Sequence, residues 1–204
     1  MLKYMKYSSI LEAIFKNAND RPEKLALCDS KRCMSYAELW SSILYCADCV
    51  TSIGIRDKDS VVIIAKPVLE YMVLFHAIQL VGAIPIPVEK NCSETRLLNL
   101  FTETGAKILF SPEGYGPECY VCQKYPVLGE KTNSSVTSFP SCDAVSMILF
   151  TTGTTGNSKG IVMTHGADIA IAENILHAVN MKNDNIELVP MPFNHSFADR
   201  KSVV

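Results

Sequence analysis

Val145–Thr164, VSMILFTTGTTGNSKGIVMT, is the stretch that most strongly constrains the fold of this 204-residue chain. The apolar run Val145–Phe150 predicts a buried strand, and Ile161–Thr164 predicts a second strand. Between them, residues 151–160 contain four threonines, three glycines, one serine and one lysine. Glycines let backbone N–H groups approach an anion, hydroxyls add donors, and the ammonium adds charge. An ordinary polar turn is the alternative, but the lysine favours a phosphate-binding loop.

The loop differs from a Walker A loop. That motif requires glycine before the lysine and serine or threonine after it, whereas Ser158 and Gly160 flank Lys159. A strand also follows the loop where a Walker A loop has a helix, so no helix dipole would face the phosphate. Backbone N–H groups, hydroxyls and Lys159 would then hold the anion.

The rest of the chain alternates between strand and helix patterns. This alternation predicts an α/β fold with a doubly wound, mostly parallel sheet and helices on both faces. Ligands of such sheets bind beyond the carboxyl ends of the strands. The supporting signals are capping pairs, apolar runs and terminal glycines: Ser9 with Glu12, Ser35 with Glu38, Gly54, Val61–Ala65, Pro67, Gly82, Ile84–Val88, Asn91 with Glu94, Gly105 and Ile108–Phe110.

Residues 111–144 interrupt this alternation with prolines, glycines and a Ser/Thr-rich patch. We expect a connecting segment with at most one short strand near Tyr125–Leu128. Beyond the loop, Thr164 is the expected N-cap of a helix that runs to about Asn180, and Ile186–Val189 is the next expected strand.

Composition favours a cytoplasmic globular domain. The net charge of −2 gives no basic field, so we expect no nucleic-acid partner. Residues 1–18 lack the apolar core of a signal peptide. The uncharged stretch Val73–Val88 is too short and too interrupted by polar residues and prolines to cross a bilayer, so we expect no membrane span.

Eight cysteines include two pairs with CxxC spacing, Cys46 with Cys49 and Cys119 with Cys122. The pairs are too far apart in sequence for a typical zinc site, and we expect no metal ligands among them. Disulfides are also disfavoured without an export signal. Cys46 lies on the apolar stripe of a predicted helix, and His76 lies in another apolar helix, so both are expected in or beside the core.

The loop is very similar to the phosphate loop of the adenylate-forming superfamily, which includes acyl-CoA synthetases and the adenylation domains of nonribosomal peptide synthetases. Family members usually carry Thr-Ser-Gly-Thr-Thr-Gly, a variable residue, Pro, Lys and Gly. This chain has Thr152 in place of the serine and Ser158 in place of the proline, and neither change removes a phosphate donor. The resemblance continues in four further segments: Arg21–Leu27, Met34–Leu39, Leu80–Val88 and Pro190–Ser196.

This resemblance implies the incomplete N-terminal domain of an adenylate-forming enzyme. The first α/β subdomain would span 1–110, the connecting segment 111–144, and the start of the second subdomain 145–204. A carboxylic acid would attack the α-phosphorus of ATP, and a thiol of CoA or a carrier protein would then accept the acyl group. The implied phosphate-binding residues are Thr151, Thr152, Gly153, Thr154, Thr155, Gly156, Ser158, Lys159 and Gly160.

Lys159 and His195 are the candidate catalytic residues, with His195 at the wall of the acyl pocket or, alternatively, a half-solvated histidine at a strand end. His195-Ser196 stands where the amino-acid-activating branch carries Phe-Asp, which favours an acyl or aryl acid without an α-amino group. The resemblance places the Mg²⁺ ligand beyond Val204. Two alternatives stay open, a catalytically incompetent fragment and a non-enzymatic α/β binding module. We expect the chain alone not to turn over ATP.

Overall fold

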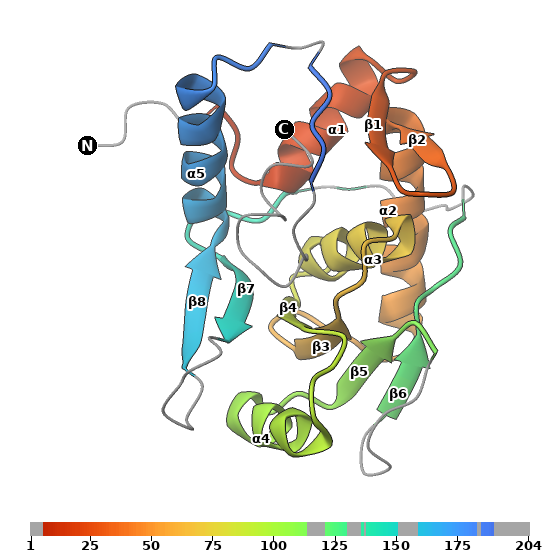
Figure 1. Ribbon diagram of the computed structural model, residues 1–204, viewed down its shortest axis with the longest axis vertical. Coiled ribbons are helices and arrows are strands. Elements are labelled where there is room, and N and C mark those ends of the chain that lie inside the picture. Colours follow the sequence, from red (N-terminus) through yellow and green to blue (C-terminus); the bar gives the residue numbers. More distant parts are fainter. Residues whose placement is uncertain are drawn as a thin grey trace.

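The computed structural model describes residues 6–113, 121–129, 136, 138–150, 159–182 and 185–189. These described residues form thirteen helices and strands, whose arrangement is drawn in Figure 1. In chain order they are α1 (Ile10–Asp20), β1 (Leu25–Cys28), β2 (Cys33–Ser35), α2 (Tyr36–Ser52), β3 (Ser60–Ile64), α3 (Leu69–Leu80), β4 (Ile84–Val88), α4 (Glu94–Thr104), β5 (Ile108–Ser111), β6 (Val121–Lys124), β7 (Val145–Phe150), β8 (Gly160–Thr164) and α5 (His165–Ala178).

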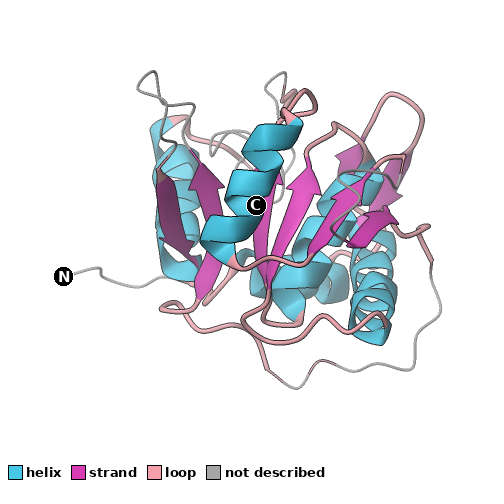
Figure 2. Cartoon of the chain, turned by 90° about the horizontal axis from the view of Figure 1, so that it is seen from below, coloured by secondary structure: helices cyan, strands magenta, loops and turns pink. Residues whose placement is uncertain are grey.

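A parallel sheet with the strand order β4-β3-β5-β6 forms the centre of the fold. Side chains of β3 alternate between two cores, as expected for a strand buried on both faces. Val61 and Ile63 pack with α1, α2 and α3, whereas Val62 and Ile64 pack with α4. Helices therefore cover both faces of the sheet (Figure 2). The predicted doubly wound α/β class is confirmed.

Local capping signals located most helix starts correctly. Ser35 and Glu38 form a reciprocal capping box at the start of α2. Ser9 caps α1 by accepting the N–H of Glu12 at 3.2 Å, although the Glu12 carboxylate turns to the N–H of Ser8 instead of Ser9. Gly105 ends α4 in the left-handed conformation, with φ +66°.

Three predicted positions and one predicted strand were wrong. Ser93, not Asn91, caps α4, because its hydroxyl lies within reach of the Arg96 N–H. Pro67 precedes the N-cap of α3 and does not lie in its first turn. The short strand β6 lies at Val121–Lys124, earlier than expected, where it pairs with β5. The segment Ile186–Val189 forms no strand and pairs with none of the described strands.

A disulfide between Cys28 and Cys33 overturns the expectation of no disulfides. The two cysteines face each other across the antiparallel hairpin of β1 and β2, a pairing that neither CxxC motif suggests. Cys46 lies in the core as expected, and burial raises the pKa of its thiol. Cys119 falls outside the described residues. Across the described ranges, no helix is long and apolar enough to span a membrane.

The hairpin of β7 and β8 is an antiparallel addition beside the parallel sheet, with β7 close to β4. Helix α5 follows β8 directly, and Thr164 caps it as predicted. The proposed subdomain boundaries at 1–110, 111–144 and 145–204 stay a prediction.

Candidate functional site

The candidate phosphate loop connects two antiparallel strands. β7 and β8 pair from Val145 opposite Thr164 to Phe150 opposite Gly160, so residues 151–159 join their adjacent ends. This strand-loop-strand arrangement confirms both predicted flanking strands. Lys159 and Gly160 are the described loop residues. The others in the predicted set lie outside the described residues: Thr151, Thr152, Gly153, Thr154, Thr155, Gly156 and Ser158, together with His195.

Gly160 lets the hairpin close tightly at the base of the loop. A Cβ atom at this position would lie 3.1 Å from Cζ of Phe150 and 3.3 Å from Cγ2 of Ile148. Any larger residue would therefore have to displace the Phe150 ring, which packs against the second core. Lys159, immediately before Gly160, is exposed at the end of the loop. The arrangement presents a cation where the loop returns to the sheet.

A buried polar bridge holds β7 against α3. The Gln79 side chain donates from Nε2 to the carbonyl oxygen of Ser146 at 3.0 Å. Oε1 of Gln79 lies 3.1 Å from Nδ1 of His76, which is also buried. Because the amide oxygen can only accept, Nδ1 of His76 must carry the proton in this pair. This bridge connects the first half of the chain to the strand that leads into the loop.

Two buried histidines, His76 and His165, lie at this junction. Burial is the main cause that lowers the pKa of His76 to about 4; the Gln79 hydrogen bond acts in the opposite direction, and the nearby His165 adds a smaller lowering effect. Burial also lowers the pKa of His165 to about 4. Both rings are therefore neutral near pH 7, as burial without a counter-charge requires. The confirmed burial of His76 agrees with its expected place in the core.

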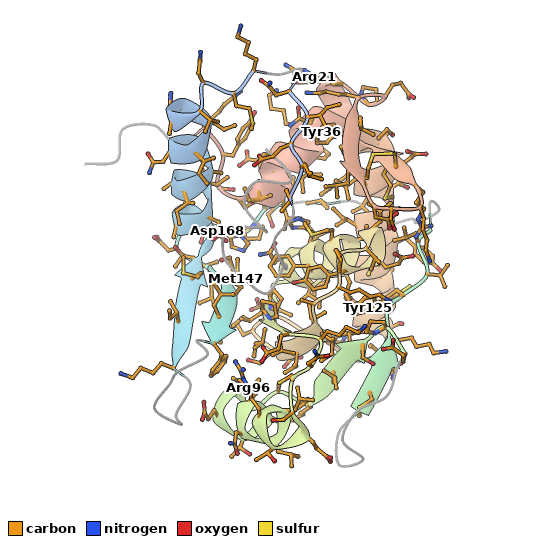
Figure 3. The ribbon with its side chains drawn as sticks, viewed as in Figure 1. Arg21, Tyr36, Arg96, Tyr125, Met147 and Asp168 are labelled. Atoms are coloured by element: carbon orange, nitrogen blue, oxygen red, sulfur yellow. A yellow bond between two sulfur atoms is a disulfide. The ribbon has the colours of Figure 1, made fainter. Side chains whose placement is uncertain are left out.

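The start of α5 is fixed to the chain just before β7. Its His165 N–H donates to the carbonyl of Ala144 at 3.0 Å, and its Gly166 N–H donates to that of Cys142 at 2.8 Å. Figure 3 shows Met147 of β7 and Asp168 of α5 on the sides turned toward α3, and both residues are buried. The end of the hairpin that lies away from the loop, where Val145 pairs with Thr164, is thus held by contacts from both α3 and α5.

A large cavity lies elsewhere in the molecule. Its volume is about 970 Å³, and it is lined by α1, β1, the starts of α2 and α3, the face of α5 that includes Ile169 and Leu176, and residues 181–182 and 185–189. No described residue of the phosphate loop lines it.

Comparison with known proteins identifies the family. The sequence pattern of the AMP-binding enzymes matches residues 14–200. The chain belongs to the AMP-binding enzyme family. Two relatives are the long-chain-fatty-acid–CoA ligase FadD13 of Mycobacterium tuberculosis, 24% identical over 179 residues, and the 2-succinylbenzoate–CoA ligase of Bacillus mycoides, 23% identical over 176 residues. The matches cover 79% and 85% of this chain but only 36% and 37% of those two proteins.

A solved structure agrees with this AMP-binding assignment at the level of the fold. The O-succinylbenzoate coenzyme A synthetase MenE of Bacillus subtilis, in complex with AMP, superposes with a TM-score of 0.81 at 20% identity. The match covers 92% of this chain and 51% of that one. This AMP-binding family member thus has the architecture of the N-terminal part of an adenylate-forming enzyme.

The sequence located the hairpin and Lys159 but missed what supports them. His76 appeared as one more core residue, and Gln79 and Ser146 carried no recognised signal. A polar pair at positions 76 and 79 among the apolar residues that follow the first turn of α3 is the signal that could have been used, because buried polar groups require partners. Among the described residues, no group of three or more His, Cys, Asp or Glu could hold a metal ion.

Proposed function

We propose that this chain forms the N-terminal, phosphate-holding part of an AMP-forming ligase that activates a carboxylic acid with ATP. One observation carries the proposal: a Gly/Thr-rich loop ending in Lys159 joins two antiparallel strands in a member of the AMP-binding enzyme family. Two relatives are acid–CoA ligases, and the MenE structure was solved with AMP. These likenesses support an acyl or aryl acid as substrate and CoA or a carrier-protein thiol as acceptor.

The reaction would proceed in two balanced steps. A carboxylate oxygen attacks the α-phosphorus of ATP, a P–O bond forms, and the bond to the β-phosphate oxygen breaks to release pyrophosphate. A thiol then attacks the acyl carbon, AMP leaves with the electron pair, and the thiol proton is lost. Negative charge grows on the departing pyrophosphate in the first step only. Hydrogen-bond donors in the loop would therefore stabilise the transition state of adenylate formation and not that of thiol transfer.

The loop residues would divide this work according to their chemistry. Backbone N–H groups near the glycines and the hydroxyls of the loop would donate to phosphate oxygens, and the Lys159 ammonium would offset their charge. His195 would border the acyl group and orient it. The absence of a carboxylate beside His195 favours an acid without an α-amino group. The described residues contain no group of three or more His, Cys, Asp or Glu side chains that could hold a metal ion such as Mg²⁺.

The first test measures binding of inorganic pyrophosphate and of ATP to the 204-residue chain by isothermal titration calorimetry. Lys159→Ala should weaken binding roughly 10- to 100-fold, because a hydrogen bond to a charged group contributes about 1.5–3 kcal/mol. Lys124→Ala is the matched control, since Lys124 is an exposed lysine on β6 at the far edge of the sheet. Equal affinities in wild type and Lys159→Ala, or an equal loss in Lys124→Ala, would contradict the proposed role.

The second test separates the phosphate site from the acyl site in a protein that contains this chain and forms acyl-adenylate. Lys159→Ala should slow adenylate formation while leaving thiol transfer from preformed acyl-adenylate less affected, because pyrophosphate participates only in the first step. His195→Ala should change the preference among carboxylic acids more than the KM for ATP. An altered KM for ATP with an unchanged acid profile would exclude the acyl-pocket role of His195.

A further inference from the structure

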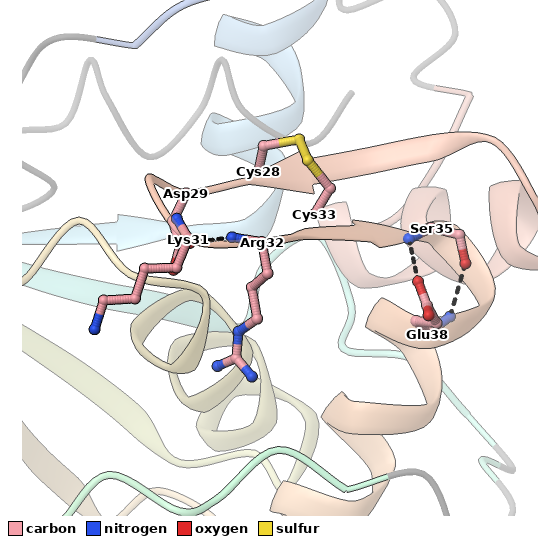
Figure 4. The surroundings of a disulfide bond; sticks show 7 residues. All are labelled: Cys28, Asp29, Lys31, Arg32, Cys33, Ser35 and Glu38. Atoms are coloured by element: carbon pink, nitrogen blue, oxygen red, sulfur yellow. Dashed lines mark hydrogen bonds between the residues drawn. A yellow bond between two sulfur atoms is a disulfide. The ribbon is translucent and has the colours of Figure 1, made fainter.

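The hairpin of β1 and β2 carries an exposed disulfide. Cys28 and Cys33 occupy opposite positions in the antiparallel register, and both residues are exposed. The bridge closes the turn formed by residues 29–32 (Figure 4). The other described cysteines, Cys46, Cys49, Cys92, Cys122 and Cys142, are thiols, and each is buried or half-buried. Oxidation is therefore confined, among the described cysteines, to the exposed hairpin pair.

The turn closed by this disulfide caps another element. The Asp29 carboxylate accepts the N–H groups of Lys31 at 2.8 Å and Arg32 at 3.0 Å through Oδ1. Its second oxygen, Oδ2, accepts the N–H of Leu69, the first residue of α3, at 3.2 Å. The N-cap residue of α3 is Val68, which forms no capping hydrogen bond through its side chain. Asp29 thus supplies from 40 residues away the cap that α3 lacks locally.

A second contact joins the same turn to the same helix end. The Arg32 guanidinium donates to the Glu70 carboxylate in the first turn of α3. Partial burial raises the pKa of Asp29, but the N–H groups of Lys31, Leu69 and Arg32 outweigh that effect and hold the pKa below its usual value. The Asp29 carboxylate is therefore ionised at neutral pH, and its negative charge interacts favourably with the positive N-terminal end of the α3 dipole.

Helix α3 connects the β1–β2 turn to the interior of the fold. Ten of its twelve residues are buried, and its last turn carries the Gln79 amide that holds β7. The position of the β1–β2 turn is therefore linked, through one rigid helix, to the base of the phosphate-loop hairpin.

We propose that Cys28 and Cys33 form a reversible redox site whose disulfide keeps the Asp29 cap on α3, and that a dithiol reductant opens it. One reductant thiolate attacks a cysteine sulfur, the S–S bond breaks, and a mixed disulfide forms. The second reductant thiol then breaks the mixed disulfide and releases the cysteine that was bound to the reductant. Two electrons and two protons pass to the protein, which gains two thiols, while the reductant becomes a cyclic disulfide. Where thiols are normally kept reduced, protein disulfides of this kind are typically transient or redox-sensing.

The test follows the 204-residue chain with dithiothreitol as the probe. Alkylation of the unfolded protein and mass spectrometry should find Cys28 and Cys33 protected before reduction and alkylated after it. Hydrogen exchange at the start of α3, at Leu69–Tyr71, should become roughly fivefold faster on reduction, the factor expected for loss of an N-cap. Reoxidation should restore slow exchange.

Variants separate the bridge from the cap. In Cys28→Ser/Cys33→Ser, the amide hydrogens of Leu69–Tyr71 should exchange rapidly with or without dithiothreitol. In Asp29→Ala, the same amide hydrogens should exchange rapidly although the disulfide is intact. Cys92→Ser, a half-buried cysteine elsewhere, should keep the wild-type response. Two results would overturn the proposal: free thiols at both positions in protein purified in air, or unchanged exchange in α3 after complete reduction of the wild-type chain. The wild-type comparison decides the matter even if a variant fails to fold.

Discussion

Replacing Gln79 by leucine should destabilise the chain by about 3 kcal/mol. The substitution keeps a side chain of similar size inside α3 but removes both hydrogen bonds of the bridge, to the Ser146 carbonyl and to His76. Each of these groups is then buried without a partner, and each such loss costs about 1–3 kcal/mol. Because Nε2 of His76 has no partner among the described residues, the imidazole would lose the one hydrogen bond that it forms within this part of the structure.

Urea denaturation followed by the fluorescence of Trp40 provides the assay. Trp40 is the single tryptophan of the chain and packs against Phe15 and Phe139 in the main core, so its emission reports global unfolding. For a chain of this length, 3 kcal/mol corresponds to a fall in Tm of about 6–12 °C. Gln123→Leu in β6 makes the same chemical change at a half-buried position and should cost no more than about 0.5 kcal/mol.

A double-mutant cycle tests the bridge itself. His76→Leu/Gln79→Leu should be less destabilised than the sum of its two single variants, because removing both partners leaves fewer buried polar groups unpaired than removing one. Two results would contradict a role of the bridge in stability: a loss of unfolding free energy in Gln79→Leu no larger than in Gln123→Leu, or additive losses for His76→Leu and Gln79→Leu in the double variant.

Two further predictions concern pH and backbone conformation. Because the pKa values of His76 and His165 fall to about 4 in the folded chain, the unfolded state binds their protons first. Their contribution to stability should be fully present above about pH 6.5 and should fall by on the order of 3 kcal/mol for each histidine by pH 4, measured by urea denaturation at several pH values. A flat profile across that range would exclude neutral buried rings. Gly82→Ala should destabilise more than Gly54→Ala in thermal melts: both glycines have positive φ, but of these two only Gly82 would bring a Cβ against a neighbouring atom, Oδ1 of Asp57. Equal losses would show that Asp57 simply moves aside.

Features encoded within a few consecutive residues were predictable from the sequence. The Ser35–Glu38 capping box, the stop at Gly105 and the apolar strand Ile84–Val88 all appear where local rules place them, because each depends on neighbours within one turn or one strand. The two strands that flank the candidate loop were predictable for the same reason. Lys159 could accordingly be placed at the loop's return to the sheet.

Other features depended on which distant segments meet. The Cys28–Cys33 bridge requires the register of β1 against β2, and the strand expected at Ile186–Val189 is absent from the described structure, since a strand requires a partner edge as well as apolar residues. The Asp29 cap and the Gln79 bridge cross 40 and 67 residues of sequence. The sequence by itself determined the α/β class, most of the helix starts and the position of the loop along the chain. Only the tertiary structure decided which side chains support that loop, because long-range hydrogen bonds depend on how the whole core packs and leave no periodic pattern in the sequence.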